Sequence, residues 1–403
     1  MNPHDSASFP KASKSGNSPQ PGEPEVLRAE SGATMPLRKR PAWAKRMGAS
    51  AYQYSPRLGE AEYSTLSRTT DIVAPSEGIM RILDLGSLNV DYVYRVDSFL
   101  APGETKAALS RAVHAGGKGL NQSVALARAG AQVFHAGKLG QGGDILRETL
   151  SEAGVDISLL RRSDLPTGHT FIQVDAAGQN CILLYGGANR DLSREDIESF
   201  LAPFGPGDLV LLQNEINEVA LAMRLAKERG LQIAFNPSPM EESVRNYPIE
   251  LVDFFILNEV EAFSLTADRG TDPENAIAAL LQRSPNAAVV LTLGAEGSIY
   301  ARGGLGDRPR SGERIRQAAY RVQAQDTTAA GDTFTGYFLA ALAEGQTPAA
   351  ALDLASKAAA ICVTRRGAAP SIPSRAEVEA FAPADTGRGL GTDPRQARSG
   401  SGR

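Results

Sequence analysis

Apolar and polar positions follow two different periods along most of the chain. Short runs rich in Val, Ile and Leu alternate with segments in which apolar residues recur every three or four positions. The first pattern predicts buried β-strands and the second predicts amphipathic helices. Strands that alternate with helices are typical of an α/β fold, in which helices cover both faces of a mostly parallel sheet. We expect strands at 81–86, 132–138, 208–213, 231–235, 252–257 and 287–293, and helices at 118–129, 143–153, 217–229, 259–266, 273–283, 330–344 and 347–364.

Two pairs of strand-like segments interrupt this alternation. The first pair is 92–99 and 106–114, and the second is 169–175 and 181–185. Residues 176–179, Ala-Ala-Gly-Gln, suit a hairpin turn between the last two. These segments predict a small antiparallel sheet, acting as a lid, built from about 89–115 and 168–186.

The two ends of the chain differ in composition from the part between them. Residues 1–79 are rich in Ser, Pro, Gly and charged residues. Residues 383–403 are rich in Gly, Arg and Ser. Such segments bury too little apolar surface to offset the entropy of ordering, so we expect disorder at both ends. The sole tryptophan, Trp43, lies in the first segment. Met80 directly precedes the first strand and could be the true start of translation, which leaves 80–382 as the folded domain.

Composition excludes several classes of protein. The chain has 403 residues, 42% of them apolar, and a net charge of −4, so a large core is possible and a basic nucleic-acid-binding surface is not expected. No apolar run reaches the ~18–20 residues of a membrane span, and the N-terminus lacks a secretory pattern. Cys181 and Cys362 each lie in an apolar run and are predicted to be buried thiols. A cytoplasmic protein is expected.

The stretch from Asp326 to Asp332, Asp-Thr-Thr-Ala-Ala-Gly-Asp, precedes an apolar helical segment. Its small residues Ala329, Ala330 and Gly331 would sit at a helix N-terminus, where free N–H groups and the helix dipole attract an anion. A carboxylate at Asp332 then suits a base beside a transferring phosphate. The alternative is an ordinary helix cap rich in Asp.

A second glycine-rich stretch covers residues 115–123, Ala-Gly-Gly-Lys-Gly-Leu-Asn-Gln-Ser. Glycines before a helix allow the backbone to approach a ligand closely. The spacing is not that of a P-loop, and no G-x-G-x-x-G follows the first strand, so a dinucleotide site is not expected. Lys118 and Asn121 supply one cation and one amide, which suits a polyhydroxylated ligand.

Polar residues also follow successive predicted strands. In an extended chain Asn89 and Asp91 point the same way. Open α/β sheets bind ligands at the carboxyl ends of their strands. Any one such residue is more often a turn or cap residue, but several on successive strand ends favour a shared binding site. The others are Glu215, Asn236, and Asn258 with Glu261.

Together these stretches resemble the ribokinase family of ATP-dependent sugar kinases, within the PfkB superfamily, over about residues 80–382. One family signature resembles residues 116–123, with Gly130 and Gly140 at the expected spacing. The other resembles residues 326–332, followed by Thr-Phe-Thr-Gly at 333–336. The resemblance implies a three-layer α/β sandwich with a β-lid. It also implies transfer of phosphate from MgATP to the 5-hydroxyl of D-ribose or a close relative.

The resemblance further implies a role for each matching residue. Asp332 would be the base, and Ala329, Ala330 and Gly331 would form the anion hole for the γ-phosphate. The implied sugar-binding residues are Asn89, Asp91, Gly117, Lys118, Asn121, Glu215 and Asp332. The implied nucleotide-site residues are Asn236, Thr292, Gly294 and Gly297, together with Ala330 and Gly331. Asn258 and Glu261 would help to place Mg²⁺, and a K⁺ site would comprise Asp326, Thr328, Gly367 and Ser371. A homodimer formed through the lid is also implied.

Other activities remain open at this point. Lys118 does not separate ribose kinases from phosphofructokinase relatives, whereas Asn89, Asp91 and the segment 213–215 favour ribose. Four residues depart from the pattern expected for this family: His169, Thr170, Leu184 and Tyr337. The alternatives are a kinase of fructose, deoxyribose, a nucleoside such as adenosine or a sugar phosphate, and a sugar-binding regulator on an inactive kinase scaffold.

Overall fold

The computed structural model of the chain describes residues 80–266, 272–303 and 312–382. All of them belong to one compact unit, Arg68–Arg403. The predicted extension at 1–79, including Trp43, and the predicted tail at 383–403 lie outside the described residues.

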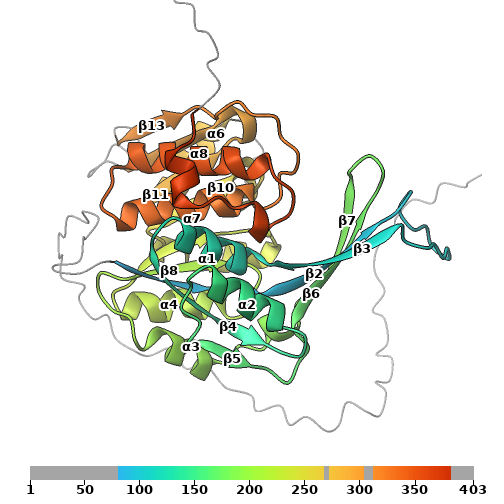
Figure 1. Ribbon diagram of the computed structural model, residues 1–403. Helices are drawn as coiled ribbons and strands as arrows, with labels where there is room; N and C mark the ends of the chain where they lie inside the picture. Colours follow the sequence, from blue (N-terminus) through green and yellow to red (C-terminus); the bar gives the residue numbers. More distant parts are fainter. Residues whose placement is uncertain (1–79, 267–271, 304–311, 383–403) are drawn as a thin grey trace, which may run out of the picture. The chain divides into compact units, whose positions relative to one another are not determined.

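A large sheet forms the centre of this unit (Figure 1). Among the described residues it has nine strands in the order β13-β12-β11-β10-β9-β8-β1-β4-β5. Every pairing is parallel except those of β12 with its two neighbours. The α/β fold class with a mostly parallel sheet is therefore confirmed. The strands are β1 (Arg81–Leu85), β4 (Gln132–Leu139), β5 (Leu160–Arg162), β8 (Leu209–Gln213), β9 (Gln232–Asn236), β10 (Phe254–Asn258), β11 (Ala288–Thr292), β12 (Ser298–Arg302) and β13 (Arg314–Gln317).

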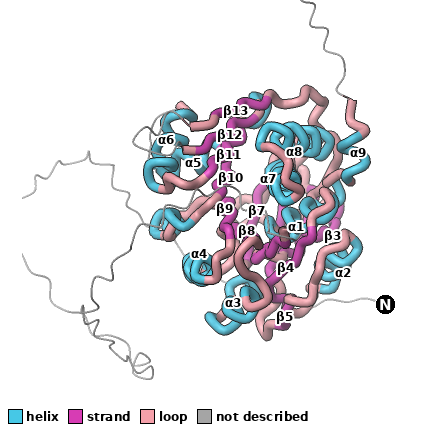
Figure 2. The backbone as a smooth tube through the Cα atoms, turned by 90° about the vertical axis from the view of Figure 1, so that its left-hand side faces the viewer, coloured by secondary structure: helices cyan, strands magenta, loops and turns pink. Residues whose placement is uncertain are grey.

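Helices cover both faces of the sheet, as Figure 2 shows edge-on. One layer contains α3 to α6, and the other contains α1, α2, α7, α8 and α9. Alternate strand residues enter opposite layers, because successive side chains of a strand point to opposite faces. In β8, Leu209 and Leu211 pack into one core while Val210 and Leu212 pack into the other. The helices are α1 (Lys118–Arg128), α2 (Asp144–Glu152), α3 (Arg194–Leu201), α4 (Val219–Glu228), α5 (Glu259–Thr266), α6 (Pro273–Arg283), α7 (Ala330–Ala343), α8 (Pro348–Val363) and α9 (Arg375–Glu379).

A second sheet of four strands, the lid sheet, extends away from the first (Figure 1). Its order is β3-β2-β6-β7. The β2–β3 and β6–β7 hairpins are antiparallel as expected, and the central pairing of β2 with β6 is parallel. That pairing begins at Asn89 and Gly168, so both hairpins leave the large sheet at the same place. The strands are β2 (Asn89–Arg95), β3 (Ser110–Gly116), β6 (Gly168–Val174) and β7 (Asn180–Tyr185).

The lid sheet also corrects one prediction. Cys362 is buried as expected, but Cys181 is exposed, so the prediction of a second buried thiol was wrong. Cys181 lies in β7, whose side chains are exposed along the whole strand. An apolar run predicts a strand there, yet it does not specify whether other elements cover that strand.

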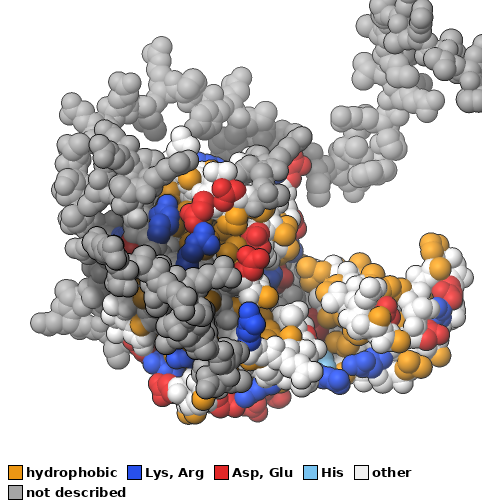
Figure 3. Space-filling model, turned by 90° about the horizontal axis from the view of Figure 1, so that it is seen from above, with side chains coloured by type: hydrophobic (Ala, Val, Ile, Leu, Met, Phe, Trp, Pro, Cys, Tyr) orange, Lys and Arg blue, Asp and Glu red, His pale blue; other side chains and the backbone are white. Residues whose placement is uncertain are grey.

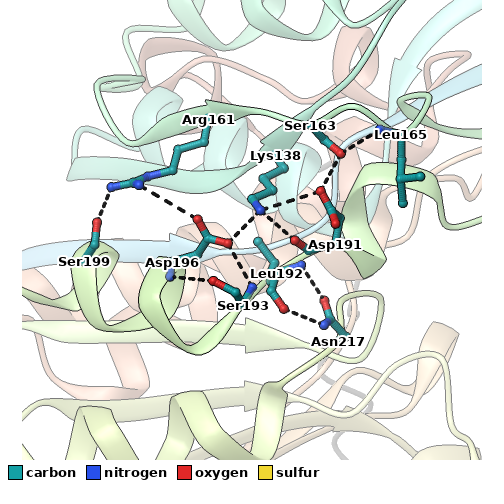
Figure 4. A network of polar contacts seen from close by, with 10 residues as sticks. All are labelled: Lys138, Arg161, Ser163, Leu165, Asp191, Leu192, Ser193, Asp196, Ser199 and Asn217. Carbon is teal, nitrogen blue, oxygen red and sulfur yellow. Dashed lines mark hydrogen bonds and ion pairs between the residues drawn. The ribbon is translucent and has the colours of Figure 1, made fainter. Parts of the chain in front are cut away.

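A polar network fixes the segment between the lid sheet and α3 (Figure 4). The Lys138 ammonium, on β4, lies 2.6 Å from Asp196 and 3.6 Å from Asp191, and donates to the Asp191 carbonyl at 2.7 Å. Asn217 forms two hydrogen bonds with the Leu192 backbone, at 3.0 and 2.8 Å. These bonds hold the 3₁₀ turn Gly187–Arg190, which precedes Asp191 and reaches the site described below. In the part of the chain that the structure describes, no helix is long and apolar enough to cross a bilayer.

Candidate active site

The candidate site lies where the chain changes direction across the large sheet. From β1 the chain reaches β4 on one side and later β8 on the other. In open α/β sheets ligands bind outside the carboxyl ends of strands at such a switch point. Residues 86–89 follow β1 there, and Glu215 follows β8 by two residues.

Asp332 is held in the first turn of α7 by residues of α1. Its side chain is 7% exposed. The Asn121 Nδ2 donates to Asp332 Oδ2 at 3.0 Å, and the Gln122 Nε2 donates to Asp332 Oδ1 at 2.8 Å. Helix α7 has no side-chain cap. Asp332 therefore does not act as a cap of its own helix, and both its oxygens are oriented by neighbouring amides.

The residues before Asp332 form an open helix N-terminus. Ala329 has φ 60° and ψ 8°, the left-handed region that costs a non-glycine residue free energy. Gly331 is exposed, and a Cβ placed there would meet no heavy atom within 4 Å. The Ala330 N–H lies 3.3 Å from the Thr327 carbonyl, so it is at Gly331 that the first turn of α7 presents backbone beside free space, as an anion site requires.

On the lid side, Asn89 and Asp91 are both fixed by partners. Asn189 Nδ2 donates to Asn89 Oδ1 at 2.8 Å, so the Asn89 amide nitrogen is left to face another acceptor. Thr170 Oγ1 donates to Asp91 Oδ1 at 2.6 Å. Burial raises the pKa of Asp91 to about 6 despite that hydrogen bond, and the charge of Glu215 contributes. A Cβ on Gly116 would lie 2.0 Å from Asp91 Oδ2, so glycine is required there.

Lys118 and Glu215 complete this group. Glu215 Oε2 accepts hydrogen bonds from the Lys118 backbone N–H, at 3.0 Å, and from the Ser87 hydroxyl. Burial acts to lower the pKa of Lys118, but the charges of Asp332, Glu215 and Glu261 outweigh it and the pKa is raised. The ammonium therefore lies in the field of carboxylates from three separate elements. Gly117, with φ 94°, precedes it at the start of α1.

The predicted nucleotide-site residues lie at the carboxyl ends of β9 and β11 and in the turn after β11. Asn236 Nδ2 donates to the Ile256 carbonyl at 2.8 Å, so part of this amide stabilises the sheet. Thr292 Oγ1 lies 3.4 Å from the Leu257 carbonyl. Gly294 and Gly297 have φ of 55° and 106°, and a Cβ on Gly297 would lie 2.0 Å from the Gln317 carbonyl. These glycines allow a tight turn after β11.

Asn258 and Glu261 cap α5. The Asn258 N–H donates to Glu261 Oε2 at 3.0 Å, and the Glu261 N–H donates to Asn258 Oδ1 at 2.9 Å. The capping alternative therefore describes this pair correctly. Among the described residues no three His, Cys, Asp or Glu side chains form a metal-binding cluster. Mg²⁺ usually binds one or two carboxylates together with waters and substrate phosphates, and the Glu261 carboxylate fits that donor set.

The predicted cation residues are brought together by hydrogen bonds. Asp326 accepts from the Thr328 N–H and hydroxyl, at 2.9 and 2.6 Å, and from the Gly367 N–H at 3.0 Å. Burial acts to raise the pKa of Asp326, but these hydrogen bonds and the charge of Arg366 lower it overall. Ser371 is buried, and the Cys362 thiol lies 3.1 Å from its hydroxyl and 3.6 Å from the Thr328 carbonyl.

Comparison with known proteins identifies the family. The sequence model described as pfkB family carbohydrate kinase matches residues 81–375. The chain belongs to the pfkB family of carbohydrate kinases. It is 36% identical to ribokinase from Haemophilus influenzae over 304 residues, 74% of this chain and 96% of that protein. It is 30% identical to deoxyribokinase from Salmonella typhi over 306 residues, 73% of this chain and 96% of that protein.

Solved structures of the pfkB family share its fold. The structure of Arabidopsis thaliana ribokinase complexed with ribose and ATP matches with a TM-score of 0.67 and 29% identity. The match covers 75% of this chain and 98% of that one. Membership of the pfkB family makes this chain an ATP-dependent sugar kinase with a nucleotide-binding site.

Two residues that contact residues of the candidate active site were not identified from the sequence. Gln122 lies inside the glycine-rich signature 116–123, between Asn121 and Ser123, but helical spacing did not predict that its side chain contacts Asp332. Asn189 belongs to no motif that was recognised. Of the departures from the family pattern, Thr170 contacts Asp91, whereas Tyr337 is fully buried and donates to the Pro373 carbonyl at 2.7 Å.

Proposed function

We propose that this kinase transfers the γ-phosphate of MgATP to the 5-hydroxyl of D-ribose, with Asp332 as the base. The arrangement of Asp332 carries the proposal. Its carboxylate adjoins the open N-terminus of α7 and accepts hydrogen bonds from Asn121 and Gln122 of the glycine-rich stretch. A base between an anion site and a sugar site is what in-line phosphoryl transfer requires.

Several groups around Asp332 suit sugar hydroxyls. Asn121 Oδ1 is buried without a hydrogen-bond partner among the described residues, so a hydroxyl donor would relieve an unpaired acceptor. Asp91 and Glu215 offer further acceptors, while Asn89 and Lys118 offer donors. A compact ligand dense in hydroxyls can satisfy this set.

The chemistry then needs few steps from the protein. Asp332 accepts the proton of the attacking hydroxyl, and the N–H groups of the first turn of α7 stabilise the charge on the transferring phosphoryl group. Mg²⁺, when bound with ATP, would neutralise phosphate charge near Glu261 and Asp332. Closure of the lid sheet would exclude water and limit ATP hydrolysis.

A substrate panel tests the choice of sugar. At saturating MgATP we expect kcat/KM for D-ribose to exceed that for 2-deoxyribose, fructose, fructose 6-phosphate and adenosine by about tenfold or more, because a site built for hydroxyls disfavours analogues that lack one. A better substrate among the other four would overturn ribose and keep the kinase. Sugar binding without ATP turnover would instead identify a regulator.

The bonds around Asp326 support a monovalent cation site that orders the anion hole. We expect activity to rise when K⁺ replaces a bulky organic cation at constant ionic strength and fixed MgATP. Equal rates in both salts would remove K⁺ from the proposal.

The lid sheet supports the proposed homodimer. Hydrophobic side chains are exposed along it (Figure 3) and, because successive strand residues alternate, on both of its faces; exposed apolar surface commonly marks an interface. Leu183→Glu should convert a dimer to a monomer in light scattering, and a wild-type monomer would exclude the dimer. The exposed apolar residues are Leu109, Val113, Phe171, Ile182, Leu183, Leu184 and Tyr185.

A further inference from the structure

A continuous chain of buried side chains extends from Asp332 into the centre of the fold. It crosses α1 and the strands β8, β1 and β4, and apart from Asp332 each member is 0–1% exposed. None of its inner members can contact sugar or nucleotide. In order, the chain comprises Asp332, Gln122, Gln213, Asp84, Ser123 and His135.

The amide orientations along this chain depend on one another. Gln213 Nε2 donates to Asp84 Oδ1 at 2.9 Å and to Gln122 Oε1 at 2.8 Å, which uses both its hydrogens. With its oxygen so engaged, Gln122 turns its Nε2 toward Asp332 Oδ1, at 2.8 Å, and toward Asn236 Oδ1, at 3.4 Å. A flipped Gln213 would place its oxygen against two other acceptors, at a large cost inside a protein.

Asp84 determines which way the Gln213 and Gln122 side-chain amides point. Its Oδ1 faces Gln213, and its Oδ2 accepts from the Ser123 hydroxyl at 2.8 Å. Ser123 Oγ also lies 2.8 Å from His135 Nδ1. Burial raises the pKa of Asp84 to about 8, yet a proton on Oδ2 can be donated to Ser123 and leaves Oδ1 an acceptor. Both protonation states therefore hold Gln213 the same way.

We propose that Asp84 is a positioning residue for Asp332, because it fixes the Gln213 and Gln122 amides and so aims one N–H donor at the base. The inference rests on the proposed role of Asp332. Asp84 acts on the orientation of the carboxylate and touches neither substrate.

Two substitutions at Asp84 separate positioning from packing. Asp84→Asn keeps an oxygen toward Gln213 and an NH₂ group toward Ser123, so kcat should stay near the wild-type value. Asp84→Leu has a similar volume and no acceptor. Its kcat should fall by about tenfold or more, the scale of one misplaced hydrogen bond to a charged group, with KM for sugar and MgATP little changed.

Ser123→Ala provides the matched control. Assayed above pH 8, where Asp84 is ionised and needs no acceptor for a proton, it alters the same buried cluster on the far side of Asp84 and leaves the path from Asp84 through Gln213 to Gln122 intact, so kcat should be retained. An equal loss of kcat in Ser123→Ala and Asp84→Leu would show that only packing matters and would overturn the proposal. An equal loss in Asp84→Asn would overturn it as well.

Gln213→Met tests the same path without changing Asp84, and serves if Asp84→Leu fails to fold. Met fills the volume of Gln but donates no hydrogen bond, so kcat should fall as in Asp84→Leu. The double variant should be no slower than either single one, because both interrupt one path. Multiplicative losses would contradict a shared path.

The result for Asp332→Asn distinguishes failure of this inference from failure of the proposed function. Retained turnover in Asp332→Asn would remove Asp332 as the base, and the proposed function with it. Lost turnover there, combined with a normal kcat in both Asp84→Leu and Gln213→Met, would overturn only the positioning role.

Discussion

At the scale of single residues, Asp332 combines burial with two amide donors from a different helix. Its position after three small residues was enough to predict a base from the sequence. The identity of its partners was only half predicted: Asn121 was expected to face the sugar, and Gln122 was not expected at all. Their directions depend on how α1 packs against α7, which local periodicity does not determine.

Asp332→Asn should lower kcat by at least ~10²-fold, the usual contribution of a general base, while ATP binding is retained. Steady-state kinetics and nucleotide titration measure both effects. Asp144→Asn, an exposed first-turn carboxylate of α2, is the control and should leave kcat unchanged. Normal turnover in Asp332→Asn would rule out the assignment.

The buried pair Asp84 and His135 makes stability depend on pH in opposite senses. Burial raises the pKa of Asp84 from 3.8 to about 8, so the folded state holds a proton that the unfolded state releases. This contribution to stability is lost as pH rises toward 8. Burial lowers the pKa of His135 from 6.5 to about 3, so its contribution is lost as pH falls below 6.5.

Between pH 6.5 and 8, Asp84 is the member of this pair whose protonation differs between the folded and unfolded states. The free energy of unfolding should therefore fall as pH rises through this interval. Asp84→Asn removes the titration, so its stability relative to the wild type should increase over that interval. Urea unfolding at several pH values measures the difference. A difference between the two proteins that does not vary with pH would contradict burial of a protonated Asp84.

At the scale of elements, buried strands were predicted well because their apolar runs are continuous. The expected strand at 208–213 corresponds to β8 (Leu209–Gln213). Strands of the first lid hairpin were displaced: the segment expected at 92–99 is β2 (Asn89–Arg95), whereas the second hairpin was placed to within one residue at each strand end. A sheet without a covered core face lacks a clear period-two signal, so its pairing depends on residues distant in sequence.

Asn189 illustrates such a long-range requirement. Its amide accepts from the Leu88 N–H at 3.0 Å and donates to the Leu88 carbonyl at 3.2 Å and to Asn89 Oδ1 at 2.8 Å. It therefore joins the start of β2 to the 3₁₀ turn after β7. Asn189→Ala should raise KM for the sugar by about tenfold, because Asn89 loses its fixed orientation, with KM for MgATP unchanged.

Ser284→Ala is the control for that variant. Ser284 is also buried and donates to the backbone carbonyl of one distant residue, Ile249, at 2.8 Å, but it has no bond to Asn89 or to the turn that contains Asn189. Its loss should reduce stability without a selective effect on the sugar. Similar KM values in Asn189→Ala and the wild type would mean that Asn89 is oriented by other contacts.

At the scale of the whole molecule, alternation of strands and helices was sufficient to predict the fold class. The antiparallel edge was not predicted: β12 mixes polar and apolar residues, and β13 has four residues with alternating arginines rather than an apolar run. The switch point between β1, β4 and β8 also depends on strand order, which a sequence pattern leaves open. The residues that follow those strands were nevertheless recognised as a common site.

The first described residue and the last described helix, α9, are both anchored in the fold. Met80 is 3% exposed in the core beside α1, and Val378 of α9 is fully buried in the same core. Arg375 of α9 donates to the Ala129 carbonyl at 2.9 Å. Each candidate site residue lies between these limits.

A protein comprising residues 80–382 should therefore fold and retain the kcat/KM of the full chain, and it should lack tryptophan fluorescence because Trp43 is removed. Circular dichroism and kinetics compare it with the full-length protein. A shortened protein that is unfolded or inactive would show that residues outside 80–382 contribute to the domain.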